Sequence, residues 1–182
     1  MDKFTQAELS GRTIFNEKLI KNGSSGITFT ESKYDKVDVF WEKNETKYVG
    51  EIKYRDNYPS SGLCVVSEGA VIEKTKYDEL MKYKDLSGLT PYYIMIFNNN
   101  EMYLWDVSEI KEIEWKVENR YPRTTKGSRK EKVAKIVTYL PLESGHKCRF
   151  SWYVYIDVRT LKRVIVLIYK KKEHYLKCSF FI

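Results

Sequence analysis

The chain is built from segments in which apolar residues recur every three or four positions and segments in which they recur every second position. Residues 5–22 follow the first pattern, which predicts a helix. Thr5 and Glu8 have the spacing of an N-terminal capping box, and Gly23 suits the position just after a helix. Residues 27–30 predict a short strand, and residues 34–55 predict two paired strands.

The segment 34–55, YDKVDVFWEKNETKYVGEIKYR, predicts a β-hairpin. If Asn44 and Glu45 form the loop, the numbers of opposite residues sum to 89, so Asp38 faces Glu51. Lys53 then follows Glu51 on the same face of the sheet, because side chains alternate along a strand. A four-residue loop would move the pairing by two residues and leave these three groups on one face.

The rest of the first 119 residues predicts one more helix and two more strands. A loop over residues 55–69 precedes a second helix at residues 70–84, and strands follow at 91–97 and 102–107. The nearly continuous apolar run at 91–97 is typical of a strand that is covered on both faces. This order predicts a domain of the α/β (α+β) class, with a central mixed sheet flanked by helices.

Charge divides the chain of 182 residues, whose length suits one domain. Residues 1–119 hold 16 Lys and Arg against 21 Asp and Glu, whereas residues 120–182 hold 16 against 4. We expect a core over residues 1–119 and a basic, β-rich C-terminal extension over residues 120–182, packed on the same domain, with a β-hairpin near 148–169. Such a basic region is typical of polyanion contact; a solvated basic face without a partner is the alternative. The candidate phosphate contacts are Arg120, Arg123, Lys126, Arg129, Lys130, Lys132 and Lys135.

Several common classes of site lack their motifs in this sequence. Apolar runs such as residues 164–169 are too short to span a bilayer, and the N-terminus does not resemble a signal sequence. Three cysteines without a Cys-x-x-Cys motif argue against a disulfide framework, so we expect a reducing, cytoplasmic setting. Two histidines are too few for a His-rich metal site, and neither a nucleotide-binding P-loop nor a Gly-x-Ser-x-Gly motif occurs.

The shared face of the hairpin carries chemistry that suits a divalent cation. Mg²⁺ prefers oxygen ligands, commonly one or two carboxylates completed by water and substrate phosphate. Asp38 and Glu51 offer carboxylates, and the backbone carbonyl of Ile52 offers a third oxygen. Lys53 would orient the attacking water or stabilise negative charge in the transition state. The alternative is an ion pair on a solvated sheet face.

Asp38 followed by Glu51-Ile52-Lys53 resembles the site of the PD-(D/E)xK nuclease superfamily, the fold of many restriction endonucleases and Holliday junction resolvases. The resemblance covers residues 5–107 and implies a restriction-endonuclease-like core. It implies that Asp38 and Glu51 bind Mg²⁺, with Mn²⁺ as a substitute, that Lys53 is catalytic, and that Glu17 on the first helix assists. Val37 stands where the family commonly has proline.

The second helix has a weaker resemblance to the family. Glu79, Leu80 and Tyr83 have the spacing of a Gln-Leu-x-x-Tyr motif found in exonuclease branches, with Glu in place of Gln. Glu73 and Tyr77 are the other candidate site groups on this helix. Two apolar stripes describe it equally well; the residues of the first are Ala70, Glu73, Tyr77, Leu80 and Met81, and those of the second are Ile72, Lys76, Leu80 and Tyr83.

Together these features predict a Mg²⁺-dependent DNA endonuclease that hydrolyses phosphodiester bonds with a metal-activated water. The first alternative is a nucleic-acid-binding protein of the same fold that does not cleave. The second is a protein–protein interaction module whose basic surface docks on an acidic partner. We expect DNA as the partner, with RNA left open, no membrane association, and a homodimer as the assembly that would cut both strands.

Overall fold

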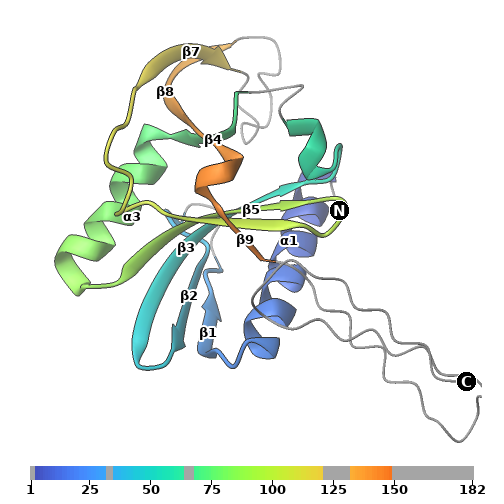
Figure 1. Cartoon of the computed structure of the whole chain (residues 1–182), viewed down its shortest axis with the longest axis vertical. Helices are drawn as coiled ribbons and strands as arrows, with labels where there is room; N and C mark the ends of the chain where they lie inside the picture. Colours follow the sequence, from blue (N-terminus) through green and yellow to red (C-terminus); the bar gives the residue numbers. More distant parts are fainter. Residues whose placement is uncertain (1–2, 32–34, 64–67, 121–131, 149–182) are drawn as a thin grey trace, which may run out of the picture. The chain divides into compact units, whose positions relative to one another are not determined.

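The computed structural model describes residues 3–31, 35–63, 68–120 and 132–148, all within the compact unit Met1–Cys148. Figure 1 labels its elements along the chain. The helices and strands are α1 (Lys3–Lys21), β1 (Ser25–Phe29), β2 (Val39–Lys43), β3 (Thr46–Arg55), η1 (Ser60–Gly62), β4 (Ala70–Glu73), α3 (Lys74–Ser87), β5 (Thr90–Phe97), β6 (Met102–Asp106), β7 (Lys116–Arg120), β8 (Val133–Leu140), η2 (Leu142–Ser144) and β9 (His146–Cys148).

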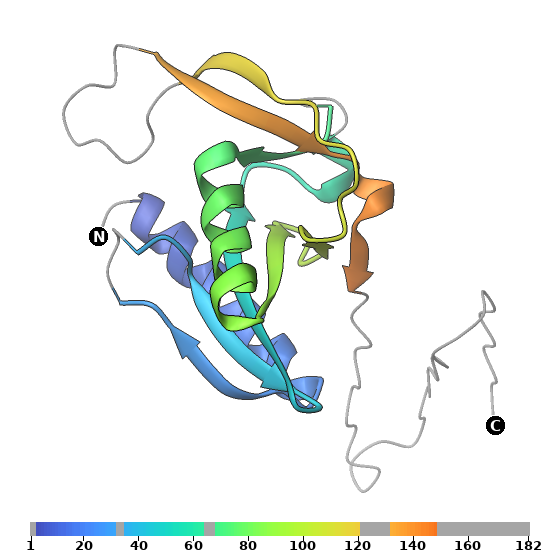
Figure 2. The same cartoon turned by 90° about the vertical axis from the view of Figure 1, so that its left-hand side faces the viewer.

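Within the described residues, the strands form a larger sheet in the order β1-β2-β3-β5-β6-β9 and a smaller one in the order β4-β8-β7. The larger sheet is mixed, because β3 and β5 run parallel while its other neighbouring strands pair antiparallel. This arrangement confirms the predicted α/β class with a mixed sheet between helices. In Figure 2 the yellow and orange strands β7 and β8 extend across one end of α3.

Helices cover both faces of the larger sheet. Phe15 and Leu19 of α1 pack with Ile52 and Ile94 on one face. Leu80 of α3 packs in the cluster on the other face, together with side chains of β3, β5 and β6. Because both faces are buried, the β5 sequence is apolar almost throughout, as its continuous apolar run predicted.

The β2–β3 hairpin has the predicted register. Trp41 pairs with Tyr48, and Lys43 pairs with Thr46, so the loop is Asn44-Glu45. Both loop residues have positive φ, 49° and 65°, which is the conformation of a type I′ turn. The antiparallel ladder brings the two halves of the segment 34–55 together as the sequence indicated.

The second predicted helix begins later than expected. Residues 70–73 form strand β4, and α3 starts at Lys74, so the predicted helix at 70–84 is wrong at its N-terminal end. Ala70 and Ile72 are buried alternately and pair with β8, which accounts for the period-two pattern Ala-Val-Ile-Glu. Pairing with a strand more than sixty residues away is a tertiary contact that the local pattern could not indicate.

Two predicted features of the C-terminal region have different outcomes. Strand β8 lies within the extension that the sequence predicted to be basic and β-rich. The hairpin predicted near 148–169 lies outside the described residues. No helix in the described part of the chain is long and apolar enough to cross a membrane.

The turn conformation gives a test of the hairpin. Glu45 has φ 65°, a region where a residue with a side chain is strained by about 1 kcal/mol relative to glycine. We expect Glu45→Gly to raise the free energy of unfolding in urea by about 0.5–1 kcal/mol. The control Thr46→Gly, in the adjacent strand, should lower it, because glycine weakens a strand. Equal destabilisation by both substitutions would contradict the turn assignment.

Candidate active site

A buried carboxylate lies near the centre of the larger sheet. Glu51 on β3 is 1% exposed and lies between β2 and β5, where it pairs with Tyr93 in the parallel ladder. Gly50, just before it, lets the sheet pack closely, because a Cβ at this position would lie 2.7 Å from Ile94 Cδ1. Alternation along β3 places Glu51 and Lys53 on the face of Val49, which α3 covers.

Two lysines neutralise this carboxylate from different elements. Lys53 Nζ lies 2.5 Å from Glu51 Oε1, and Lys76 Nζ, on α3, lies 2.8 Å from Glu51 Oε2. Burial alone would raise the pKa of Glu51, but Lys53 and Lys76 more than offset it and lower this pKa below its usual value. Burial likewise disfavours the Lys53 cation, yet the Glu51 carboxylate raises the Lys53 pKa above normal.

Asp38 reaches the same place from just outside the β2–β3 ladder. The regular pairing ends at Val39–Gly50, and the Asp38 N–H donates to the Gly50 carbonyl at 2.8 Å. The predicted direct pairing of Asp38 with Glu51 is therefore replaced by an irregular strand end. Val37 and Val39 also show that the strand is irregular here. Residues two apart share a face in a regular strand, but these two pack in clusters on opposite faces of the sheet.

The Asp38 carboxylate is held in a polar but largely buried position. Its Oδ2 accepts a hydrogen bond from the Ile52 N–H at 2.7 Å. Burial, and then the nearby charge of Glu51, raise the pKa of Asp38 to about 6. The two carboxyl groups therefore have pKa values displaced in opposite directions. We call Asp38, Glu51, Lys53 and Lys76 the acid–lysine cluster.

Helix α1 contributes an arginine and an acid on the Asp38 side of the cluster. Arg12 Nη2 lies 3.5 Å from Asp38 Oδ1 and 2.9 Å from Glu8 Oε1, while its Nη1 donates to the Thr30 carbonyl at 2.6 Å. The predicted helical acid, Glu17, is exposed. It is nine residues from Glu8, about two and a half helical turns, and so projects from the opposite side of α1. Glu8 and Arg12 are four residues apart in the sequence, a spacing that predicts an ion pair on one side of the helix.

On the second helix, the side chain that enters the cluster is Lys76. Glu73 ends β4 and pairs with Lys135 Nζ at 2.7 Å, and the ring of Tyr77 lies 5.5 Å from that of Trp115 in an edge-on contact. Glu79 is half-buried. None of these three predicted groups has a described contact with the acid–lysine cluster. Lys76 belongs to the second of the two candidate stripes, on the same side of the helix as the buried Leu80.

Some of the predicted phosphate contacts lie in the described part of the chain. Arg120 pairs with Glu118 at 2.8 Å and donates to the Tyr139 hydroxyl, and Lys135 pairs with Glu73. Lys132 is exposed. Their positions on β7, β8 and the residue before β8 place basic side chains around the smaller sheet. The other predicted contacts, Arg123, Lys126, Arg129 and Lys130, lie outside the described residues.

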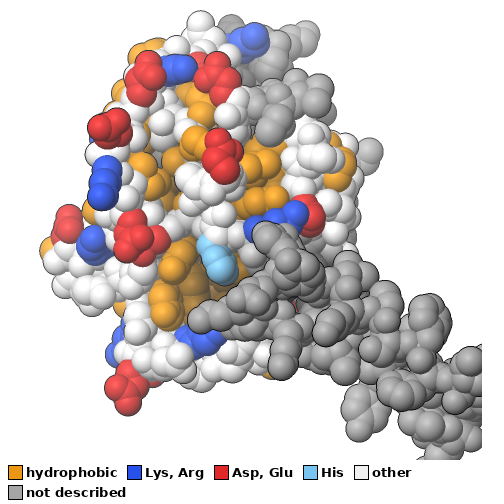
Figure 3. All heavy atoms as spheres, viewed as in Figure 1, with side chains coloured by type: hydrophobic (Ala, Val, Ile, Leu, Met, Phe, Trp, Pro, Cys, Tyr) orange, Lys and Arg blue, Asp and Glu red, His pale blue; other side chains and the backbone are white. Residues whose placement is uncertain are grey.

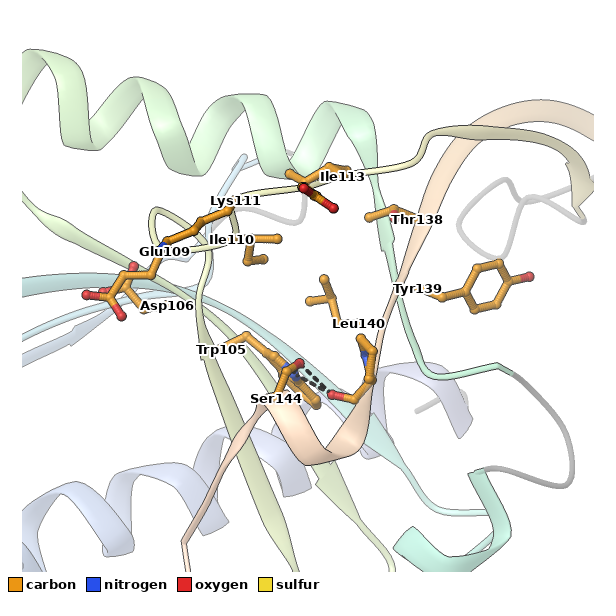
Figure 4. Close-up of a pocket in the computed structure, with 12 residues that line it drawn as sticks. Trp105, Asp106, Glu109, Ile110, Lys111, Ile113, Thr138, Tyr139, Leu140 and Ser144 are labelled. Carbon is orange, nitrogen blue, oxygen red and sulfur yellow. Dashed lines mark hydrogen bonds between the residues drawn. The ribbon is translucent and has the colours of Figure 1, made fainter.

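A separate cavity of about 410 Å³ lies between β6, β8, η2 and residues 109–113. Figure 3 shows hydrophobic side chains exposed among charged ones on the face viewed in Figure 1. Figure 4 shows Trp105, Ile110 and Leu140 lining the cavity, with Glu109 and Lys111 nearby. The cavity shares no residue with the acid–lysine cluster, so the two are separate features of the described chain.

The oxygen donors of the cluster fit a hard divalent cation. Two carboxylates and the Ile52 carbonyl match the ligand type of Mg²⁺, which usually keeps several waters. Among the described residues, no group of three or more His, Cys, Asp and Glu side chains is placed to hold a metal, so a closed protein cage of the zinc type does not fit. The hydrogen bonds of Lys53 and Lys76 show that positive charge is accommodated at both Glu51 oxygens.

Comparisons with known proteins return few matches. No family model matches the chain, and no curated protein matches it significantly. Among solved structures, a match is the Holliday junction resolvase Hjc of the archaeal hyperthermophile Archaeoglobus fulgidus. It is 14% identical, covers 58% of this chain and 82% of its own, and superposes with a TM-score of 0.44.

The raised pKa of Asp38 predicts a pH dependence of stability. The folded protein binds the proton more tightly than the unfolded chain, so the free energy of unfolding should fall by on the order of 2–3 kcal/mol from pH 4 to pH 7 through this group. Asp38→Asn should remove this fall, as measured by urea unfolding at several pH values. The matched control Asp78→Asn, at an exposed ion pair of α3, should keep the wild-type profile. A wild-type profile for Asp38→Asn would contradict the assignment.

Proposed function

We propose that this protein is a metal-dependent nuclease that hydrolyses phosphodiester bonds in DNA. The observation that carries the proposal is the pair of carboxyl groups whose pKa values are displaced in opposite directions beside Lys53. Such separated titrating groups are typical of sites in which each acid has its own task. A buried ion pair alone is weak evidence for stability, which adds weight to a chemical role for Glu51.

The residues have distinct roles in this proposal. Asp38 and Glu51, with the Ile52 carbonyl, would hold Mg²⁺, or Mn²⁺ in its place. The bound cation would supply positive charge for the phosphate and lower the pKa of a coordinated water. Lys53, 37% exposed at its side chain, can reach both Glu51 and a phosphate at the surface. Its ammonium would orient the attacking water or stabilise the charge that develops on phosphorus-bound oxygens.

Arg12 and Glu8 support the Asp38 side of the site. Arg12 is 17% exposed and forms ion pairs with both acids, which fixes the guanidinium beside the Asp38 carboxylate. We propose that Glu8, through Arg12, takes the supporting part that the family resemblance implied for Glu17. A planar guanidinium suits this bridging role because it can donate to two acceptors at once.

The substrate is proposed to be DNA because the C-terminal region is strongly basic. A tract of lysines and arginines neutralises phosphates without reading bases, which is the expected source of affinity for a polyanion. RNA has the same phosphate charge and remains the alternative substrate. A homodimer is the proposed assembly for cutting both strands, since each protomer carries one acid–lysine cluster.

A second candidate function is nucleic-acid binding without cleavage. It is favoured by the hydrogen bonds of Lys53 and Lys76, which together neutralise Glu51. A site whose charges are already balanced can persist as a structural ion cluster. Plasmid nicking with Mg²⁺ or Mn²⁺ that is abolished by EDTA would decide for the nuclease, and binding without nicking would decide for this alternative.

Lys53→Ala tests the catalytic assignment. We expect loss of plasmid nicking by at least about a hundredfold, because the charge beside the reacting phosphate is removed. Lys76 still pairs with Glu51, so the fold, checked by circular dichroism, and DNA binding should remain. The control Lys47→Ala, exposed on the same strand, should nick normally. Full nicking by Lys53→Ala would remove Lys53 from the mechanism.

The basic tract has its own test. Replacing Lys126, Arg129 and Lys130 together by alanine should weaken binding to all DNA sequences alike and reduce the dependence of log K on log salt by about 3. Fluorescence anisotropy at several salt concentrations measures both effects. Lys82→Ala with Lys84→Ala, exposed on α3, serves as the control that removes two positive charges elsewhere. An unchanged salt slope in the tract variant would show that DNA is held elsewhere.

A further inference from the structure

Lys76 occupies the second oxygen of the buried Glu51 carboxylate. Its Nζ lies 2.8 Å from Glu51 Oε2 and also donates to the Lys36 carbonyl at 3.0 Å. The first oxygen, Oε1, is held by Lys53 at 2.5 Å. Both oxygens of the carboxylate therefore already have a cation, and the two cations come from different elements.

A divalent ion that binds Glu51 would lie close to the ammonium groups of Lys53 and Lys76. Two positive charges a few ångströms apart repel strongly in a partly buried site, where water screens them poorly. The Lys76 side chain is 27% exposed, so a path to solvent exists for its ammonium. Its four-carbon stem lets the charge swing away while the helix backbone stays in place.

From these contacts we propose that Lys76 is an exchangeable counter-cation, which neutralises Glu51 in the metal-free protein and competes with the divalent ion for Oε2. The inference rests on the proposed metal-dependent function, and it concerns a residue outside the Asp and Glu-x-Lys pattern. Lys76 is thus a positioning residue that acts through Glu51. Its removal should strengthen metal binding, whereas a merely structural role would leave metal binding unchanged or weaken it.

Isothermal titration with Mn²⁺ on the full chain tests the competition. Lys76→Met keeps most of the side-chain length without the charge, and we expect its Kd for Mn²⁺ to be about tenfold lower than that of the wild type, equivalent to about 1.4 kcal/mol. Lys74→Met is the matched control on the same helix, because Lys74 pairs with Asp78 at 2.7 Å. Its Kd should remain within about twofold of the wild type.

Thermal unfolding provides a second readout. Without metal, Lys76→Met should unfold at a lower temperature than the wild type, because Glu51 loses one of its counter-charges. Added Mn²⁺ should raise the Tm of Lys76→Met by more than that of the wild type, because the ion replaces the missing charge and binds more tightly. If Lys76→Met does not fold, Lys76→Gln, which keeps a hydrogen-bond donor, takes its place in both experiments.

The outcomes separate this inference from the proposed function. Wild-type protein that binds Mn²⁺, together with a Lys76 variant that binds it equally or more weakly, overturns the counter-cation and leaves the nuclease proposal standing. Absence of Mn²⁺ binding in both proteins overturns the metal-dependent function and this inference with it. In a Glu51→Gln background, Lys76→Met should give no gain in affinity, and a gain there would show that Lys76 does not act through Glu51.

Discussion

A carboxylate buried in the middle of a sheet needs opposite charge within hydrogen-bonding distance, and Glu51 imposes this requirement on the surrounding elements. The strand itself supplies Lys53, two residues further along the same face. The second charge has to come from α3, which covers this face of the sheet. The helix must therefore begin where Lys76 can reach Glu51 Oε2. Strand β4 ends at Glu73, and the helix starts at the next residue, which places Lys76 in the first turn. The segment that connects β3 to the parallel strand β5 therefore contains both α3 and the second counter-charge of Glu51, Lys76.

The two acids of the cluster differ because their counter-charges differ. Glu51 is the more deeply buried of the pair, but two ammonium groups hold it in the charged form. For Asp38, the charges of Lys53 and Lys76 and one backbone hydrogen bond from Ile52 lower the pKa, but they do not offset its burial and the charge of Glu51. The irregular end of β2 is what gives Asp38 this setting, because a regular ladder would have placed it on the same face directly opposite Glu51. Local strand geometry thus determines which acid has the raised pKa.

Sequence patterns were sufficient for the hairpin and for the groups that one strand carries. The register of β2 with β3 follows from the alternation and the loop length, and Glu51 and Lys53 share a face for the same reason. Side chains contributed by helices were harder to place, because Glu17 and Glu8 both lie beside apolar residues of α1, and the packing of the helix on the sheet decides between them. In the sequence, Lys76 belonged to one of two equally plausible sets of residues along one side of α3. Only the contact of Lys76 with Glu51 on β3 shows which set faces the sheet.

The charges of the site balance one another among the described residues. Arg12 contacts Asp38 and Glu8, while Lys53 and Lys76 contact Glu51, so three cations meet three carboxylates. If the site binds a divalent ion as proposed, the ion would give it an excess of positive charge, and a phosphate group entering with the ion would offset that excess. Under the proposed function, such a site is therefore better suited to binding a metal and a phosphodiester together than to binding a metal alone.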